Sequence, residues 1–444
     1  MIMGDNEDIK RKNRHKRRVR NQIISYIILL LLICLIGFLG YKGIKLLVSK
    51  IKNNAEVPVE VATVADSSVS EDQVPVISTP EYEDLPDVSS NDAGVSENKV
   101  EDTAARAYID GLTTEQKVAS LFIVTPESIT GVNTATQAGE GTRQALTENM
   151  VGGIVYASKN VSNSPDFKAM VSTTKSMYSE LYGCDLWAVV NEEGAVNTIA
   201  GYASGVTAQQ VASELGSSGD NNNAYTAYVN IATTLSDYGI DVDMAPVCDV
   251  SSNPQGFIGN RSFSSDADIA SSMVKSAVSG LNDKEVIACL SSFPGQGEAN
   301  TNPANGVSTI DRSIDDLKTA EYLPFQAGID EGASMVMMSN VIDAMASDES
   351  VPCSMSKKVI ESLRTDLGFE GIVVSGPLDD KAITGQFSQG DAAVNAINAG
   401  CDMIFRPANY KEAYEGVLAA VNDGTISAER LDEALMRIYS KKFQ

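Results

Sequence analysis

The chain of 444 residues contains one histidine and one tryptophan. The histidine is His15, in a basic segment near the N-terminus, so residues 103–444 contain none. An acid/base step that depends on histidine, and a metal site with histidine ligands, are therefore excluded from that part of the chain. Trp187 lies in an apolar, strand-like run, and we expect it to be a core residue.

Cysteines are few and lack the CxxC spacing of zinc and redox sites. Cys34 belongs to an apolar N-terminal segment. The other five are an odd set scattered singly, which does not indicate a disulfide framework, and we expect small buried side chains at Cys184, Cys248, Cys289, Cys353 and Cys401. The sequence thus predicts no metal and no cofactor.

The charges are unevenly distributed. Residues 1–52 hold 12 of the 34 Lys and Arg but only three of the 59 Asp and Glu, so the remaining chain has a net charge of −34. A body this acidic argues against nucleic acid as a partner. The basic segment is short and lacks interleaved aromatic residues, which also disfavours nucleic-acid binding.

Residues 23–41 contain no charge and, as a helix of about 28 Å, match a bilayer core of about 30 Å. This predicts one transmembrane helix, preceded by a basic cytoplasmic segment, residues 1–22, whose eight Lys and Arg orient it. A cleaved signal peptide is the alternative, but the apolar run is longer than usual and no small-x-small site follows. The expected localisation is a single-pass protein of the cell membrane with the bulk of the chain extracellular.

Residues 42–102 form a juxtamembrane and acidic linker without helical or alternating periodicity. From residue 103 to 444 the composition is that of a globular domain. Eight short apolar runs alternate there with amphipathic helical stretches, and we predict strands at Leu121–Val124, Gly153–Ala157, Leu186–Asn191, Val242–Val247, Val286–Phe293, Met335–Val341, Gly371–Ser375 and Met403–Phe405.

Eight such units in about 340 residues predict an α/β fold, a (β/α)8 barrel of the TIM type. A doubly wound open sheet stays an alternative, because periodicity does not distinguish the two. In either case the functional residues are expected just after the strands, at their C-terminal ends.

Several motifs near the strand ends resemble glycoside hydrolase family 3, close to its single-domain β-N-acetylglucosaminidases. They are LTTEQKVASLFIV from Leu112, VGGIVYASKNV from Val151, GIDVDMAPVCDVSSNPQGFIGNRSF from Gly239, FPGQG from Phe293, LRTDLGFEGIVVS from Leu363 and AGCDMIF from Ala399. The resemblance implies hydrolysis of β-linked sugars with retention, through an Asp nucleophile after the seventh strand. It also implies an Asp-His acid/base pair on the loop after the fifth strand.

At the positions that match these catalytic residues, the sequence has others. The nucleophile position is Gly376, which has no side chain, and the acid/base pair falls on Asn302 and Ala304. The sugar-binding Lys and His of the family correspond to Ser291 and Ser292. We therefore predict that no residue is catalytic in the family's manner.

Other positions around the expected pocket retain polar side chains. Glu193, Asp249 and Arg261 match the family, whereas Asn191 and Asn340 replace an Asp and a His. Amides can still hydrogen-bond hydroxyl groups without carrying charge. These residues, with Ser291 and Ser292, are the candidate ligand-binding set.

Three functions are open at this stage. The first is a glycan- or cell-wall-binding protein of the cell surface that no longer hydrolyses its ligand. The second is an active β-N-acetylhexosaminidase-like glycosidase in which relocated carboxylates, with Asp379, Asp380 and Glu298 as candidates, form a new catalytic pair. The third is a scaffold that binds a surface protein, with polar loop residues of no catalytic use.

Overall fold

Eight short parallel strands form the centre of residues 97–444, the part that the computed structural model describes, apart from residues 196–197, 200–207 and 348–349. Their residues are buried except for the half-buried Ile287, because both faces of the sheet are covered. The strands are β1 (Phe122–Val124), β2 (Gly153–Val155), β3 (Trp187–Val190), β4 (Val242–Asp243), β5 (Ile287–Phe293), β7 (Met335–Met338), β9 (Ile372–Val374) and β10 (Ile404–Phe405).

The sheet closes on itself. Its strand order is β10-β1-β2-β3-β4-β5-β7-β9, with every neighbouring pair parallel. The two end strands meet where Val374 forms a parallel bridge with Met403 and the amide of Ser375 donates to the Met403 carbonyl at 2.8 Å. The predicted (β/α)8 barrel is confirmed, and the open doubly wound sheet is not found.

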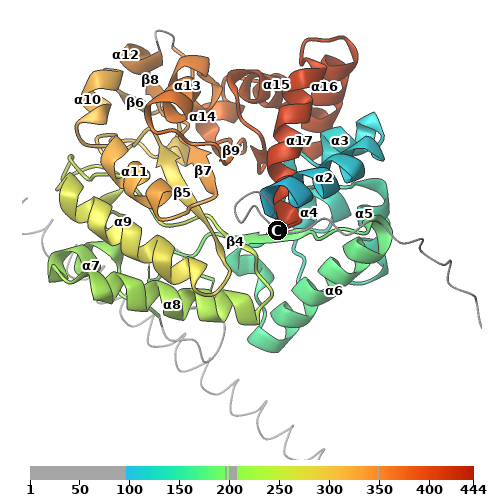
Figure 1. Cartoon of the computed structure of the whole chain (residues 1–444), viewed down its shortest axis with the longest axis horizontal. Coiled ribbons are helices and arrows are strands. Elements are labelled where there is room, and N and C mark those ends of the chain that lie inside the picture. The colour runs from blue at the N-terminus through green and yellow to red at the C-terminus, as the bar shows by residue number, and fades with distance from the viewer. Residues whose placement is uncertain (1–96, 196–197, 200–207, 348–349) are drawn as a thin grey trace, which may run out of the picture. The chain divides into compact units, whose positions relative to one another are not determined.

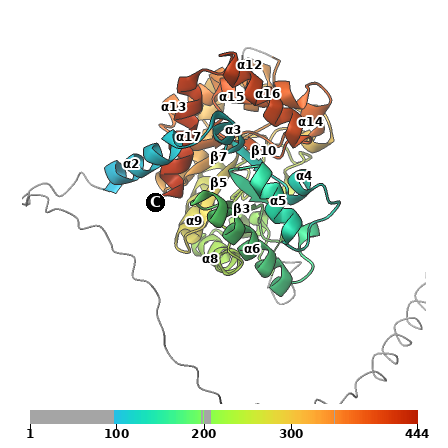
Figure 2. The ribbon, with the colours of Figure 1, turned by 90° about the vertical axis from the view of Figure 1, so that its right-hand side faces the viewer.

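Helices surround the strands (Figure 2). The longer ones are α2 (Glu97–Asp110), α6 (Ser164–Tyr182), α8 (Asn221–Asp237), α9 (Ala267–Asn282), α11 (Tyr322–Asp330), α13 (Lys357–Asp366), α15 (Gln389–Ala399), α16 (Tyr410–Asn422) and α17 (Ala428–Lys442). The shorter ones are α3 (Thr114–Ala119), α4 (Pro126–Thr130), α5 (Glu140–Glu148), α7 (Ala212–Ser218), α10 (Ile314–Lys318), α12 (Ala344–Ser347) and α14 (Lys381–Thr384). Figure 1 shows the long helices α8 and α9 running along one side.

Local sequence determines where many of these helices begin. A Ser, Asn or Asp side chain just before the first turn accepts a hydrogen bond from a backbone N–H that the helix itself leaves unpaired. The residues that do so are Asn163, Asp220, Asp266, Ser313, Ser356, Ser388, Asn409 and Ser427. Each helix start therefore follows from one polar residue next to an amphipathic stretch.

The amphipathic stretch over residues 314–331 forms two helices instead of one. It breaks between Lys318 and Tyr322, giving α10 and α11. Pro324 has no backbone N–H to donate, so it is tolerated in the first turn of α11 but not inside one continuous helix. A small parallel pair, β6 (Thr309–Ile310) and β8 (Ile342–Asp343), was not predicted, because two-residue strands have no periodicity to recognise.

The prediction of a single-pass membrane protein requires correction. In the part of the chain that the structure describes, no helix is long and apolar enough to span a bilayer. The longest, α6, has 19 residues but includes Asp166, Lys168, Lys175 and Glu180. The segments assigned to the cytoplasm and the membrane, residues 1–22 and 23–41, lie outside the described residues, as does most of the linker.

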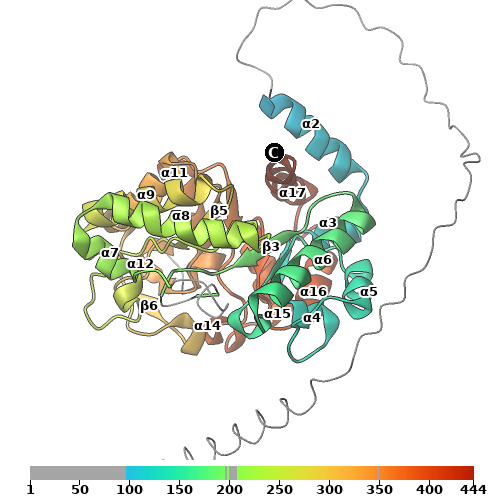
Figure 3. The same cartoon turned by 90° about the horizontal axis from the view of Figure 1, so that it is seen from below.

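The N-terminal helix α2 lies beside the C-terminal helix α17 (Figure 3). Arg106 pairs with both carboxylate oxygens of Asp432 at 2.6 and 2.8 Å, and the rings of Tyr108 and Tyr439 are 4.9 Å apart. The helix begins at Glu97, before the boundary predicted at residue 103. Helices α2 and α17 thus pack together at the surface of the barrel.

Predictions about the core are confirmed. The five described cysteines are free and buried, and Trp187 is buried at the start of β3. The ammonium group of Lys442 lies 4.4 Å from the centre of the Trp187 ring and donates to the Gly152 and Asp185 carbonyls. The end of α17 is thereby fixed to the N-terminal ends of the strands.

A single buried carboxylate ties the helices to the closing seam. Asp402, fully buried before β10, accepts hydrogen bonds from Arg364, Arg430 and Arg437, of α13 and α17, at 2.7–3.1 Å. Its Oδ2 also accepts the backbone N–H of Val373 in β9, at 2.9 Å. Oδ2 is therefore shared between β9 and α13, while Oδ1 accepts the two arginines of α17.

We expect Asp402→Ala to reduce the free energy of unfolding by about 3–5 kcal/mol, because three guanidinium groups would lose a buried partner. Asp432→Ala is the control, since its ion pair with Arg106 is about two-fifths exposed and contributes less than about 1 kcal/mol. Chemical denaturation of the full chain measures both. Equal losses in the two variants would contradict the role given to Asp402.

Candidate functional site

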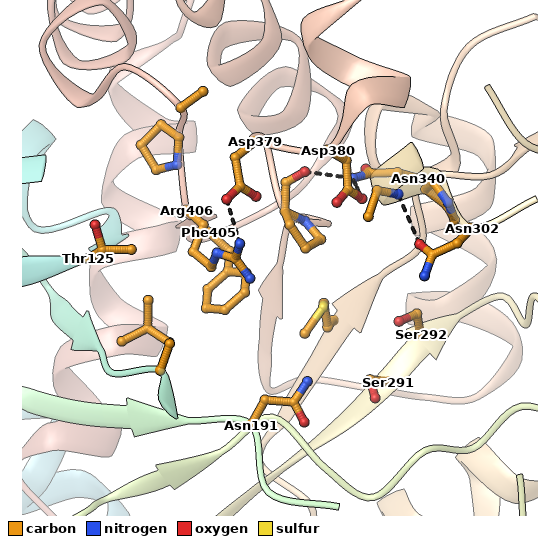
Figure 4. Close-up of a pocket in the computed structure, with 18 of the residues that line it drawn as sticks. Thr125, Asn191, Ser291, Ser292, Asn302, Asn340, Asp379, Asp380, Phe405 and Arg406 are labelled. Carbon is orange, nitrogen blue, oxygen red and sulfur yellow. Dashed lines mark hydrogen bonds and ion pairs between the residues drawn. The ribbon is translucent and has the colours of Figure 1, made fainter. Parts of the chain in front are cut away.

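A pocket of about 890 Å³ opens at the C-terminal ends of the strands. Loops after all eight barrel strands contribute to its lining, as the barrel fold predicts. Predicted residues in the lining are Asn191, Arg261, Ser291, Ser292, Asn302, Ala304, Asn340, Asp379 and Asp380. Figure 4 shows Asp379 and Asp380 on one side of the pocket and Asn191 on the opposite side.

The residues after β5 line one wall. Ser291 and Ser292 are part of the strand itself, and both are buried. Asn302 does not project freely, because its Oδ1 accepts the backbone N–H of Ala304 at 2.9 Å and begins a short 3-10 helix, Pro303–Asn305. At the positions that resemble an acid/base pair, the loop thus presents an amide and a methyl group.

Behind the pocket, Glu193 and Arg261 form a two-point ion pair. Two guanidinium nitrogens of Arg261 lie 2.7 Å from the two carboxylate oxygens of Glu193. The side chain of Glu193 is only 3% exposed, and Arg261 neutralises its charge. Arg261 reaches the pocket lining, whereas Glu193 supports it from behind.

Asp249 is also buried behind the lining. Its Oδ1 accepts the backbone N–H of Gln296 at 2.8 Å, while its Oδ2 has no hydrogen-bond partner among the described residues. Burial raises the pKa of Asp249 to about 7, against the opposing effects of the Gln296 N–H and of Arg261. Asp249 therefore holds the loop after β5 and is not itself among the lining residues.

Gly376 and Asn340 are in direct contact across the ends of β7 and β9. A Cβ atom at Gly376 would lie 2.8 Å from Nδ2 of Asn340, and closer still to its Oδ1 and Cγ. Asn340 is 2% exposed and is held in place. Its Nδ2 donates to the Pro377 carbonyl at 2.8 Å and to Asp380 at 2.9 Å, and its Oδ1 accepts from Ser354 at 2.7 Å. A side chain at position 376 would have to displace this amide.

Two carboxylates follow β9 into the pocket. Asp379 pairs with Arg406 at 2.5 Å through Oδ2, while its buried Oδ1 has no partner among the described residues. Asp380 accepts from Asn340, and burial raises its pKa to about 6, with a smaller contribution in the same direction from Asp379. The two carboxylates thus differ in environment, since one has a cation partner and the other an amide.

Glu298, a candidate for a relocated catalytic pair, is not in the pocket lining. It is about half exposed and its nearest cation is Arg312, at 3.4 Å. Sequence reasoning also missed two lining residues, Glu127 after β1 and Lys159 after β2, which form an ion pair at 3.1 Å. Applying the strand-end rule to the first two strands would have found both.

The profile of the glycosyl hydrolase family 3 N terminal domain matches residues 113–441. A beta-hexosaminidase of Neisseria gonorrhoeae is 28% identical over 273 residues, which cover 60% of this chain and 73% of that protein.

Solved structures are similar as well. A glycoside hydrolase family 3 beta-N-acetylglucosaminidase from Paenibacillus sp. str. FPU-7 is 30% identical with a TM-score of 0.70 over 75% of this chain, but only 63% of the Paenibacillus chain is covered. Beta-N-acetylhexosaminidase from Beutenbergia cavernae DSM 12333 is 26% identical, with a TM-score of 0.67, 74% of this chain and 98% of that one being covered. The chain belongs to glycosyl hydrolase family 3.

Proposed function

We propose that this protein binds a glycan in the barrel pocket without hydrolysing it. The observation that carries the proposal is the contact between Gly376 and Asn340. Gly376 stands where the family resemblance expects the carboxylate nucleophile, and the space a side chain would need there contains the Asn340 amide. Without that nucleophile a glycosyl-enzyme intermediate cannot form at this position.

The second group required for glycoside cleavage is an acid that protonates the leaving oxygen and then activates water. Asn302 and Ala304 occupy those positions and line the pocket. Neither an amide nor a methyl group transfers a proton at neutral pH. The two deficits are independent, because they lie on loops after different strands.

The pocket remains suited to a hydroxylated ligand. Its volume of about 890 Å³ is within the range of small-molecule sites. Asn191, Ser291, Ser292 and Asn340 line it with amides and hydroxyls, which exchange hydrogen bonds with sugar hydroxyls. The relatives named as hexosaminidases support a sugar as the ligand class.

We expect the full chain to release no nitrophenol from nitrophenyl β-N-acetylglucosaminide or β-glucoside, and Gly376→Asp alone to restore no turnover. The new carboxylate collides with Asn340, and Asn302 and Ala304 supply no acid/base group at the positions expected for it, a loss typically of 10²- to 10⁴-fold. Nitrophenol release measures turnover, and intact-mass spectrometry reports any trapped sugar.

A double variant, Gly376→Asp with Asn340→Ala, separates the two deficits. It removes the collision, so a sugar adduct on the enzyme without sustained turnover is the expected result with an activated aryl glycoside. Steady turnover by the unmodified chain would contradict the proposal.

A rewired hydrolase is the second candidate, and one observation favours it. Asp379 and Asp380 both line the pocket, and the pKa of Asp380, raised to about 6 by burial, suits a general acid. If this were the function, the unmodified chain would turn over a glycoside and Asp380→Asn would abolish that activity. Absence of turnover across a panel of β-glycosides rejects it.

We expect Asn191→Ala to weaken glycan binding by roughly tenfold, because the variant loses a polar group of the lining. The fold should be unaffected, since Oδ1 of Asn191 has no partner among the described residues. Asn223→Ala, at an exposed position of α8, is the matched control. A glycan array followed by calorimetry on the full chain gives the affinities, and equal affinity of both variants would contradict a pocket-bound glycan.

A further inference from the structure

The charged groups of the pocket are almost all paired with one another. Three cations lie in the described lining, and each already contacts a carboxylate: Lys159 contacts Glu127 at 3.1 Å, Arg261 contacts Glu193 at 2.7 Å and Arg406 contacts Asp379 at 2.5 Å. An anionic ligand would have to compete with these carboxylates for every cation. The pocket is therefore not built for an acidic sugar.

Two carboxylates of the lining, Asp379 and Asp380, share the cation Arg406. Arg406 pairs with Asp379 at 2.5 Å and attracts Asp380 from further away, while Asp380 accepts a hydrogen bond from the neutral amide of Asn340 at 2.9 Å. Among the described residues Asp380 forms no ion pair, and its partial burial raises its pKa to about 6. Arg406 offsets only one of the two charges, so a cation brought by the ligand would compensate the other.

The neighbouring carboxylate adds negative charge at the same place. Oδ2 of Asp379 is occupied by Arg406, while its Oδ1 is buried and has no hydrogen-bond partner among the described residues. Oδ1 is therefore not open to a ligand, but its charge strengthens the attraction of a cation to Asp380. Asp379 and Asp380 lie on the same side of the pocket (Figure 4).

On the opposite side, the lining carries the neutral amide of Asn191 and the hydroxyl of Ser291. The pocket thus has an incompletely neutralised carboxylate pair on one side and neutral polar groups on the other. An ammonium group has three N–H donors and no acceptor, and a sugar hydroxyl can donate one hydrogen bond. A sugar that carries both groups matches both sides.

We infer that the ligand is a glycan with a free amine, an unacetylated hexosamine unit, whose ammonium group binds Asp380. This inference rests on the proposed glycan-binding function and specifies its ligand class. N-acetylation of the amine removes the positive charge and with it this ion pair. The preference for a free amine is therefore electrostatic, and charge-assisted hydrogen bonds of this kind are about twice as strong as neutral ones.

Calorimetry on the full chain with three tetrasaccharides of the same linkage tests the inference: β-1,4-linked glucosamine, N-acetylglucosamine and glucose. We expect the glucosamine tetramer to bind roughly tenfold or more tightly than the other two. Asp380→Asn should remove this preference. Asn340 can still donate to the new amide oxygen, so the variant should fold.

Because the chain is acidic overall, with a formal charge of −25, a cationic glycan could also be attracted to its surface. Asp315→Asn, which removes the same charge at an exposed position of α10, is the matched control and should keep the full preference. A preference for glucosamine that persists in Asp380→Asn, or that falls equally in Asp315→Asn, overturns the inference. Equal binding of all three tetramers overturns it too but leaves glycan binding standing, whereas no binding of any tetramer overturns the proposed function itself.

Discussion

The closing seam between β9 and β10 is the constraint on which the rest of the domain depends. The ring of strands is complete only where β9 meets β10, through one bridge between Val374 and Met403, and these strands are three and two residues long. So short a seam has few backbone hydrogen bonds. Asp402 reinforces the seam, because it accepts a hydrogen bond from the backbone N–H of Val373 and further hydrogen bonds from three arginines of α13 and α17. Strands and outer helices are thereby joined at one fully buried carboxylate.

Closure is also what assembles the pocket. Asp379 and Asp380 follow β9, Arg406 follows β10 and Asn191 follows β3, so these residues are far apart in sequence. They share a pocket because parallel strands in a barrel end at the same rim. The ion pair between Asp379 and Arg406 connects the C-terminal ends of the two seam strands. Asp402 precedes β10 and lies at the opposite, N-terminal end of that strand.

Asn340 and Gly376 are neighbouring positions of the site, and the side chain at one limits what fits at the other. The amide is held by Pro377, Asp380 and Ser354, and it occupies space that a side chain at position 376 would need. The same amide gives Asp380 a neutral partner instead of a cation. One hydrogen-bonded residue thus links the proposed loss of hydrolysis with the proposed preference for a cationic ligand.

Much of this architecture was accessible from the sequence, because short buried strands appear as apolar runs and helix starts as single capping residues. All eight predicted strands occur, whereas β6 and β8 were too short to recognise and the amphipathic stretch over residues 314–331 is broken ahead of Pro324. The lack of histidine in residues 103–444 and the glycine at position 376 are also properties of the sequence alone.

What only the tertiary structure decided is which polar residues face one another. Glu298 pairs with Arg312 outside the pocket lining, whereas Asp380 lies within it beside Asn340, because side-chain partners depend on distances between loops that are far apart in the chain.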